Sequence, residues 1–274
     1  RIDRHSYMAA PRSFALSADD RAVLEAADKF ARKEFVPLAR RMDDEEWWPS
    51  DIFQKIGTAG FMGATVPAEH GGAGMDLFSS GLICQAFARW NPAIALSWAA
   101  HDNLCVNNIF RNANEVQRRQ YLPGLCDGSK IGALGLTEPG AGSDALGSMR
   151  STARRDGDHY VLNGTKIFIT NGPVADVLLV YMRTAGKDAG SKCMTAFIVE
   201  RGMKGFSTAQ KLDKLGMRGS NTCELVFQDC EIPQENVLGE VNEGVRVLMR
   251  GLNTERLVLT GGPIGLMQAA MDIA

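Results

Sequence analysis

The residue best suited to chemistry is a glutamate on an otherwise apolar helix face near the end of the chain. Glu255 shares that face with residues at helical spacing, namely Val245, Leu248, Leu252 and Leu259. The positions three and four residues from Glu255 hold Gly251, Val258 and Leu259, so no local cation pairs with it as on an ordinary exposed helix. Burial raises a carboxyl pKa and makes the carboxylate a stronger base at neutral pH. The spacing therefore predicts a proton-abstracting residue on a helix from about 243 to 274.

Composition limits the classes of partner. The 274 residues include 30 basic and 32 acidic side chains, and the net charge of -2 gives no general attraction to nucleic acid or to an anionic membrane. No apolar run approaches the roughly 18 residues of a membrane span. Six cysteines are scattered without a CxxC pair, which predicts reduced thiols and no metal site.

Helical patterns dominate the first half of the chain. Ser17 and Asp20 can cap a helix that runs to about Ala39. Further helical segments are expected at 51–59, 79–89, 93–111 and 115–126. We expect an N-terminal α-helical domain at 14–130, preceded at 1–13 by a leader or remnant. The glycine-rich stretch 67–74 lacks the spacing of a nucleotide fingerprint, so a plain turn is favoured over a phosphate site.

Short β-type segments follow, rich in β-branched and aromatic residues and separated by turn residues: 150–155, 159–162, 166–170, 177–183, 194–200 and 223–228. They predict an antiparallel β-sheet domain at 131–240, with Asn163-Gly164 as a type I′ hairpin turn. Residues 241–274 then read as the first helix of a third, α-helical domain. The predicted fold class is α+β, and the chain reads as part of a longer one.

Two stretches of the β domain offer candidate binding surfaces. Residues 137–144, TEPGAGSD, follow a short apolar strand at 131–136 and present hydroxyls and backbone N–H groups suited to a polar ring edge or a phosphate. In the strand 166–170, Phe168 and Thr170 are expected on one face. Taken alone, each stretch is more often an ordinary loop or strand than a site.

Four motifs together resemble the acyl-CoA dehydrogenase family of flavoproteins. They are TEPGAGSD at 137–144, FITNG at 168–172, LDKLGMRGSNTCEL at 212–225 and GLNTERLVL at 251–259. The resemblance runs in order from about Phe14 to Ala274. It implies FAD as cofactor, an acyl-CoA substrate, electron-transferring flavoprotein as electron acceptor and a homotetramer built as a dimer of dimers, closed by a C-terminal helical bundle of which only the first helix is present here.

The resemblance also implies roles for single positions. Most family members carry the catalytic base far beyond position 274, but the branch that oxidises isovaleryl-CoA carries it at the position of Glu255. The implied flavin contacts are Leu134, Leu136, Thr137, Gly142, Ser143, Phe168, Ile169 and Thr170, with Thr137 and Thr170 near the flavin N5. The implied acyl-CoA contacts are Leu96, Ser143, Ser191, Lys192, Asn253 and Arg256.

The expected reaction is FAD-dependent α,β-dehydrogenation of a short branched acyl-CoA, isovaleryl-CoA to 3-methylcrotonyl-CoA, in a bacterial cytoplasm or a mitochondrial matrix. Three departures from the family pattern leave the substrate open: Phe168 replaces a tryptophan, Asn253 an aspartate and Arg246 a tyrosine. The alternatives are a longer branched or straight acyl chain, an oxidase, or a flavin- and acyl-CoA-binding fragment without turnover.

Overall fold

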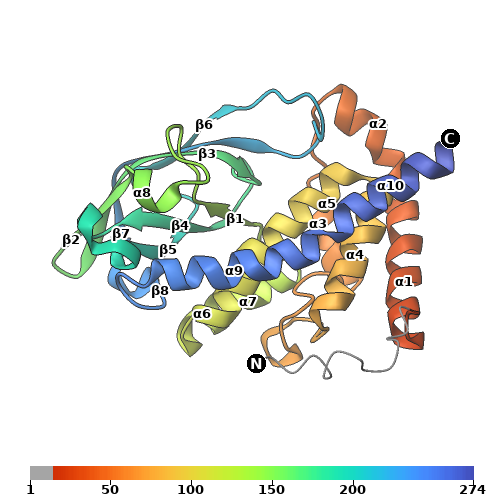
Figure 1. Ribbon diagram of the computed structural model, residues 1–274, viewed down its shortest axis with the longest axis horizontal. Coiled ribbons are helices and arrows are strands. Elements are labelled where there is room, and N and C mark those ends of the chain that lie inside the picture. Colours follow the sequence, from red (N-terminus) through yellow and green to blue (C-terminus); the bar gives the residue numbers. More distant parts are fainter. Residues whose placement is uncertain (1–14) are drawn as a thin grey trace, which may run out of the picture.

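Helices form one end of the molecule and a β-sheet the other, and the helix that carries Glu255 crosses from one to the other (Figure 1). The structure, a computed structural model, describes residues 15–274, so the predicted leader at 1–13 lies outside the described residues. The helices before the sheet are α1 Ala18–Glu34, α2 Val36–Asp44, α3 Ile52–Thr58, α4 Leu77–Trp90, α5 Pro92–Ala99, the π-helical turn η2 Ala100–Val106, α6 Asn107–Asn112 and α7 Glu115–Cys126. Residues 67–74 form a turn around the short 3-10 helix η1, Ala68–His70.

The first helix begins as predicted and ends early. Ser17 and Asp20 form a capping box, with the Asp20 N–H donating to Ser17 Oγ at 3.1 Å and the Ser17 N–H to Asp20 Oδ2 at 3.0 Å. The predicted end near Ala39 is wrong, because α1 stops at Glu34 and α2 follows after Phe35. Pro37 explains the break, since it has no N–H to donate and its ring clashes with the preceding turn.

The sheet has eight strands, mostly antiparallel, which confirms the α+β fold class. The strands are β1 Gly132–Gly135, β2 Thr152–Asp156, β3 His159–Thr170, β4 Val177–Arg183, β5 Met194–Glu200, β6 Phe206–Lys211, β7 Thr222–Pro233 and β8 Val237–Leu238; the short helices between them are α8 Ala145–Ser148, η3 Lys187–Lys192 and η4 Gln234–Asn236. Strands β1 and β2 depart from the antiparallel pattern, because each pairs with β4 in parallel. β4 and β5 are buried along almost their full length, and their side chains pack in two hydrophobic clusters.

The predicted hairpin turn at Asn163-Gly164 is wrong. Strand β3 runs straight through these residues, and the β2–β3 turn lies at Gly157 and Asp158, since Asp156 pairs with His159. Gly157 supplies the positive φ of 64° that this turn needs. Gly164 instead marks a register shift against β7, and a Cβ there would lie 2.2 Å from Ser151 Oγ. The glycine at 164 is therefore required by the close approach of Ser151 to β3, and not by a turn.

The last helical segment is also divided. α9, Gly244–Leu259, and α10, Gly261–Ile273, replace the single helix predicted from 243 to 274. Pro263 in the first turn of α10 cannot donate to the Leu259 carbonyl, which accounts for the break at Thr260. Val258 of α9 packs in the core of the N-terminal helices, whereas Val247 packs in the core shared with the sheet. Helix α9 therefore joins the two parts of the molecule.

Close packing of α10 on α4 depends on Gly261, which gives a stability prediction with a control one residue away. A Cβ at Gly261 would lie 2.2 Å from the Gly81 carbonyl oxygen of α4, whereas at Gly262 the nearest atom is Cys84 Sγ at 3.9 Å. We expect Gly261→Ala to lower the free energy of unfolding by about 1–3 kcal/mol, because backbone must move. Gly262→Ala should change it by no more than about 1 kcal/mol. Denaturant unfolding of both variants checks this, and equal effects would contradict the packing argument.

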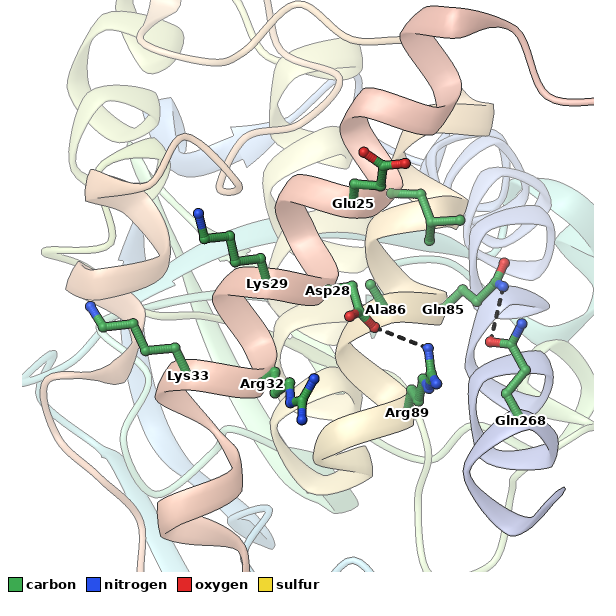
Figure 2. A pocket seen from close by; sticks show the side chains of 10 residues that line it. Glu25, Asp28, Lys29, Arg32, Lys33, Gln85, Ala86, Arg89 and Gln268 are labelled. Carbon is green, nitrogen blue, oxygen red and sulfur yellow. Dashed lines mark hydrogen bonds and ion pairs between the residues drawn. The ribbon is translucent and has the colours of Figure 1, made fainter. Parts of the chain in front are cut away.

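A surface depression of about 490 Å³ lies where α1, α4 and α10 meet (Figure 2). Arg89 of α4 pairs there with Asp28 of α1 at 3.3 Å and with Asp272 of α10 at 2.7 Å. The predicted site residues do not line this depression. Among the described residues, no helix combines the length and apolar character that a bilayer crossing requires.

Candidate active site

Glu255 is half-buried on α9, on the side that faces α4. Burial raises the pKa of its carboxyl above the usual value, and the neighbouring Arg256 opposes the rise only in part. Within residues 15–274, Glu255 has no ion-pair partner within 4.0 Å. The Cys84 thiol of α4 lies close enough that the Glu255 charge contributes, after burial, to raising the thiol pKa to about 12. The carboxylate therefore has the desolvated environment that favours a base.

An apolar cavity of about 200 Å³ lies against the last turn of α9, where Leu259, four residues after Glu255, is part of its lining. Its lining comes from α4, α5, the start of α10 and the loop before β7, and includes Cys84, Leu96, Met217, Leu259 and Leu266. Leu96 is thus on the wall of a cavity that also touches the helix of Glu255. A cavity of this size and character fits a short hydrocarbon group rather than a charged one.

The loop predicted to bind a polar ring edge follows β1 directly. Thr137 is half-buried, and its carbonyl accepts a 2.8 Å hydrogen bond from the Ile167 N–H of β3. Gly142 and Ser143 are exposed, whereas Leu134 and Leu136 pack partly into the core beneath α9. Among the described residues, the Thr137 and Ser143 hydroxyls and the Gly142 N–H have no hydrogen-bond partner, so these groups are free to meet a ligand.

Strand β3 bulges at the other predicted surface. Its pairing with β7 shifts register between Lys166 and Ile169, and Phe168 adopts a φ of 61° with 64% of its surface exposed. A left-handed backbone at a bulky residue costs on the order of 1–3 kcal/mol and collects at functional sites. After the register shift, burial still alternates along the strand end, with Phe168 exposed, Ile169 buried and Thr170 half-buried. Ile169 is 3% exposed and packs in the core of the sheet.

Asn171 connects the end of β3 to α5 and β1. Its side-chain amide donates to the Ser97 carbonyl of α5 at 2.8 Å and to the Gly132 carbonyl of β1 at 3.1 Å. Its backbone N–H donates to the Asn221 carbonyl at 2.8 Å, in the loop that carries Met217. Asn171 therefore ties the end of β3 to β1, to α5 at the residue after Leu96, and to the loop before β7.

The remaining predicted contacts lie along α9. Asn253 and Arg256 are exposed on the helix, off the face of Glu255. Ser191 and Lys192 lie in the exposed turn η3, where Lys192 pairs with Glu243 at the start of α9. Glu243 and Glu255 are about 18 Å apart along the helix at about 1.5 Å per residue. The structure therefore places Ser191 and Lys192 at the opposite end of α9 from Glu255, where η3 packs near α8, the short helix that follows Ser143.

Several residues that shape this region were not singled out from the sequence. Lys166 and Glu138 form a buried ion pair behind the loop, with Lys166 Nζ 2.8 Å from Glu138 Oε1. Asn171 and Met217 both have positive φ values. The sequence feature that could have indicated the Lys166–Glu138 pair is one charge in an otherwise apolar strand and an opposite charge in a turn-rich loop. Within the described residues, no cluster of three or more His, Cys, Asp or Glu side chains could hold a metal ion.

Comparison with known protein families agrees with this arrangement. The family model for the acyl-CoA dehydrogenase N-terminal domain matches residues 17–129, and the model for the acyl-CoA dehydrogenase middle domain matches residues 133–230. These two matches cover well over half of the chain. The chain belongs to the acyl-CoA dehydrogenase family, whose members are FAD-dependent.

Individual relatives refine the comparison. The chain is 48% identical to mitochondrial isovaleryl-CoA dehydrogenase of Pongo abelii, over 94% of this chain and 61% of that protein. Butyryl-CoA dehydrogenase from Megasphaera elsdenii superimposes with a TM-score of 0.90 at 35% identity, over 94% of this chain and 68% of that one. A glutaryl-CoA dehydrogenase from Mycobacterium smegmatis in complex with FADH2 gives a TM-score of 0.88 at 30% identity, over 94% and 64%. The chain thus spans about three fifths of the length of the first relative.

Proposed function

We propose that the protein is an FAD-dependent acyl-CoA dehydrogenase whose preferred substrate is a short branched acyl-CoA, isovaleryl-CoA. The observation that carries this proposal is Glu255, a half-buried carboxylate with a raised pKa on the helix whose last turn lines an apolar cavity of about 200 Å³. The 48% identity to an isovaleryl-CoA dehydrogenase supports the branched substrate. The proposal includes an N-terminal helical domain at 14–130, a β domain at 131–240 and the start of a C-terminal helical domain at 241–274.

The residues at the corner of β1, β3 and α5 fit a flavin ring. Phe168 offers an exposed aromatic face, which suits a planar heterocycle. The unpartnered Thr137 hydroxyl and Gly142 N–H match the hydrogen-bond acceptors along a flavin edge. Thr170 ends the bulged strand and adds another hydroxyl. In the proposed site the Thr137 and Thr170 hydroxyls form hydrogen bonds to the ring edge, and Gly142 and Ser143 contact the polar side of the ring. The backbone of Ile169 lies next to the ring, and Leu134 and Leu136 pack behind it.

The proposed reaction divides between the protein and its cofactor. Glu255 removes the α-proton of the thioester, because its desolvated carboxylate gains a proton more readily than a solvated one. Bound FAD supplies the acceptor for the hydride that leaves the β-carbon. Leu96 and its neighbours enclose the acyl group and exclude water. Asn253 and Arg256 on α9 are proposed to contact the chain beyond the thioester, and Ser191 and Lys192 the far end of the coenzyme A.

Family membership supports the proposed partners. We assign electron-transferring flavoprotein as the electron acceptor and a homotetramer, a dimer of dimers, as the assembled form. Large apolar side chains are exposed on α10, among them Met271 at 80% and Ile273 at 86%, which supports the burial of this face against further protein. The proposed compartment is a mitochondrial matrix or a bacterial cytoplasm.

A panel of acyl-CoA thioesters tests the function and separates its alternatives. We expect the purified protein to bind FAD. The absorbance of the bound flavin at ~450 nm, where oxidised flavin absorbs, should bleach fastest with isovaleryl-CoA. Leu96→Ala should favour longer chains by about fourfold in relative kcat/KM per added methylene, at about 0.8 kcal/mol each. Leu257→Ala, on the exposed side of α9, is the matched control and should leave the ranking unchanged.

Each other outcome has a defined meaning. Fastest bleaching with butyryl-CoA would assign a straight-chain substrate instead. Stoichiometric peroxide during turnover in air would indicate an oxidase. Flavin binding without bleaching by any thioester would assign a binding fragment without turnover, and failure to bind flavin would refute the proposal.

A further inference from the structure

Three consecutive residues of the loop after β1 are tied to two consecutive residues of β3. Lys166 Nζ donates to the Leu136 carbonyl at 3.2 Å and to Glu138 Oε1 at 2.8 Å. Between these contacts, the Ile167 N–H donates to the Thr137 carbonyl at 2.8 Å. We call this set of contacts the loop–strand clamp. It joins the loop of Thr137 to the strand of Phe168.

Glu138 is the centre of the loop–strand clamp. Its Oε2 accepts a hydrogen bond from the Arg150 N–H at 2.7 Å, and its Oε1 accepts one from the Ser151 N–H at 3.0 Å. Its backbone exchanges two hydrogen bonds with Ala141, at 2.9 and 3.1 Å, which closes the loop on itself. One side chain thus fixes the loop against both β3 and the segment before β2.

The ion pair of the clamp is enclosed by protein. Lys166 is 0% exposed and Glu138 6% exposed. Burial lowers the pKa of Lys166 to about 8, although Glu138 opposes that change. Burial also disfavours the charged form of Glu138, but the Lys166 ammonium and the N–H groups of Arg150 and Ser151 outweigh it and hold the carboxyl pKa below its usual value. Both groups are therefore charged at neutral pH.

Stability alone does not account for such a pair. Apolar residues of similar volume can replace a buried ion pair without loss of stability, and often with a gain. The clamp also lies next to the strained residue of the bulge: Lys166 precedes it and buried Ile169 follows it. A left-handed Phe168 persists only where its surroundings leave it no alternative. The clamp fixes the start of that bulge and, in the same contacts, the position of Thr137.

We propose that Lys166 and Glu138 are positioning residues of the flavin site, whose ion pair sets the placement of Thr137 relative to Phe168. This inference rests on the proposed function, because it assigns Thr137 and Phe168 to the flavin. Neither Lys166 nor Glu138 needs to touch the ring. Their effect reaches it through the loop on one side and the bulge on the other.

The test compares FAD binding by the purified wild-type protein and by Lys166→Met/Glu138→Gln. The double variant removes both charges and keeps one side-chain oxygen as an acceptor for the Arg150 or the Ser151 N–H. We expect its thermal unfolding midpoint to stay close to that of the wild type. We expect the Kd of the double variant for FAD to be at least about tenfold higher than that of the wild type. The visible spectrum and the reduction potential of the bound flavin should also shift. The matched control, Arg154→Met/Asp156→Asn, removes an exposed ion pair from β2 and should change none of these.

The outcomes separate the two proposals. A wild-type protein that takes up no FAD would refute the proposed function and this inference with it. A wild-type protein that binds FAD, with a folded double variant of equal affinity, spectrum and potential, would refute the positioning role alone. If the double variant does not fold, Glu138→Gln provides the same comparison, since it removes the carboxylate charge and keeps one of the two acceptor oxygens. Unchanged flavin properties in that variant would also overturn the inference.

Discussion

Glu255→Gln is expected to lower the rate of substrate-dependent flavin reduction by about 10²–10⁴-fold, the usual contribution of a positioned general base. Glutamine keeps the size of the side chain and the packing of α9 but cannot accept the α-proton. Glu255 makes no ion pair within residues 15–274, so its replacement leaves no buried partner unsatisfied. Flavin absorbance and the thermal unfolding midpoint should therefore match those of the wild type. Stopped-flow bleaching with isovaleryl-CoA under anaerobic conditions measures the effect.

Two further variants make this result specific. Glu240→Gln changes an exposed carboxylate before α9 and should leave the bleaching rate unchanged. Glu255→Asp keeps the carboxylate but withdraws it by one methylene, and should give an intermediate rate because the proton is then out of direct reach. Retention of the full rate in Glu255→Gln would exclude Glu255 as the base. A loss of bound flavin together with the rate would instead indicate a structural role.

The sequence was informative about Glu255 because the relevant signal is local. Helical spacing alone places Leu252, Glu255 and Leu259 on one face, and in α9 all three are half-buried, at the edge of a fully buried face that holds residues such as Gly251, Thr254 and Val258. The same reasoning overextended the helix to 274, since the break depends on Pro263 and on the approach of α4 to Gly261. Local periodicity reports the face of a helix better than its end.

Contacts between residues far apart in the sequence could not be predicted from local periodicity. The pairing of Lys166 with Glu138 depends on how β1 and β3 lie together, and no local pattern reports that arrangement. The same holds for Gly164, whose dipeptide matches a hairpin turn but whose glycine is required by the nearness of Ser151. The resemblance of the motifs supplied candidate residues, whereas the contacts that hold those residues in place came from the structure.

Asp102 gives a second large effect, on stability rather than on turnover. It lies in the π-helical turn η2, is 2% exposed, and accepts hydrogen bonds from the Gly63 N–H at 2.5 Å and the Ala64 N–H at 3.2 Å. Burial raises its pKa to about 7 from an ordinary value of 3.8, although both N–H groups oppose the rise. No cation among the described residues lies within 4.0 Å of it. The folded protein therefore holds a proton that the unfolded chain releases.

The sign of the pH dependence follows from this difference. Below about pH 4 Asp102 is protonated in both states, so its contribution to stability is fully present. Between about pH 4 and 7 the folded state binds more protons than the unfolded state, so stability falls as pH rises and the loss is complete above the folded pKa. At about 1.36 kcal/mol per pKa unit, the total loss from Asp102 is about 4 kcal/mol.

Asp102→Asn should remove this dependence because the amide does not titrate. We expect the unfolding free energy of the variant, relative to that of the wild type, to rise by about 4 kcal/mol between pH 4 and pH 8, whatever constant offset the amide introduces. Urea unfolding at several pH values measures the difference. The buried His101, whose pKa burial lowers to about 4, contributes equally to both proteins and cancels. Parallel pH profiles for the two proteins would show that Asp102 is already ionised in the fold, with the Gly63 and Ala64 N–H groups stabilising its charge.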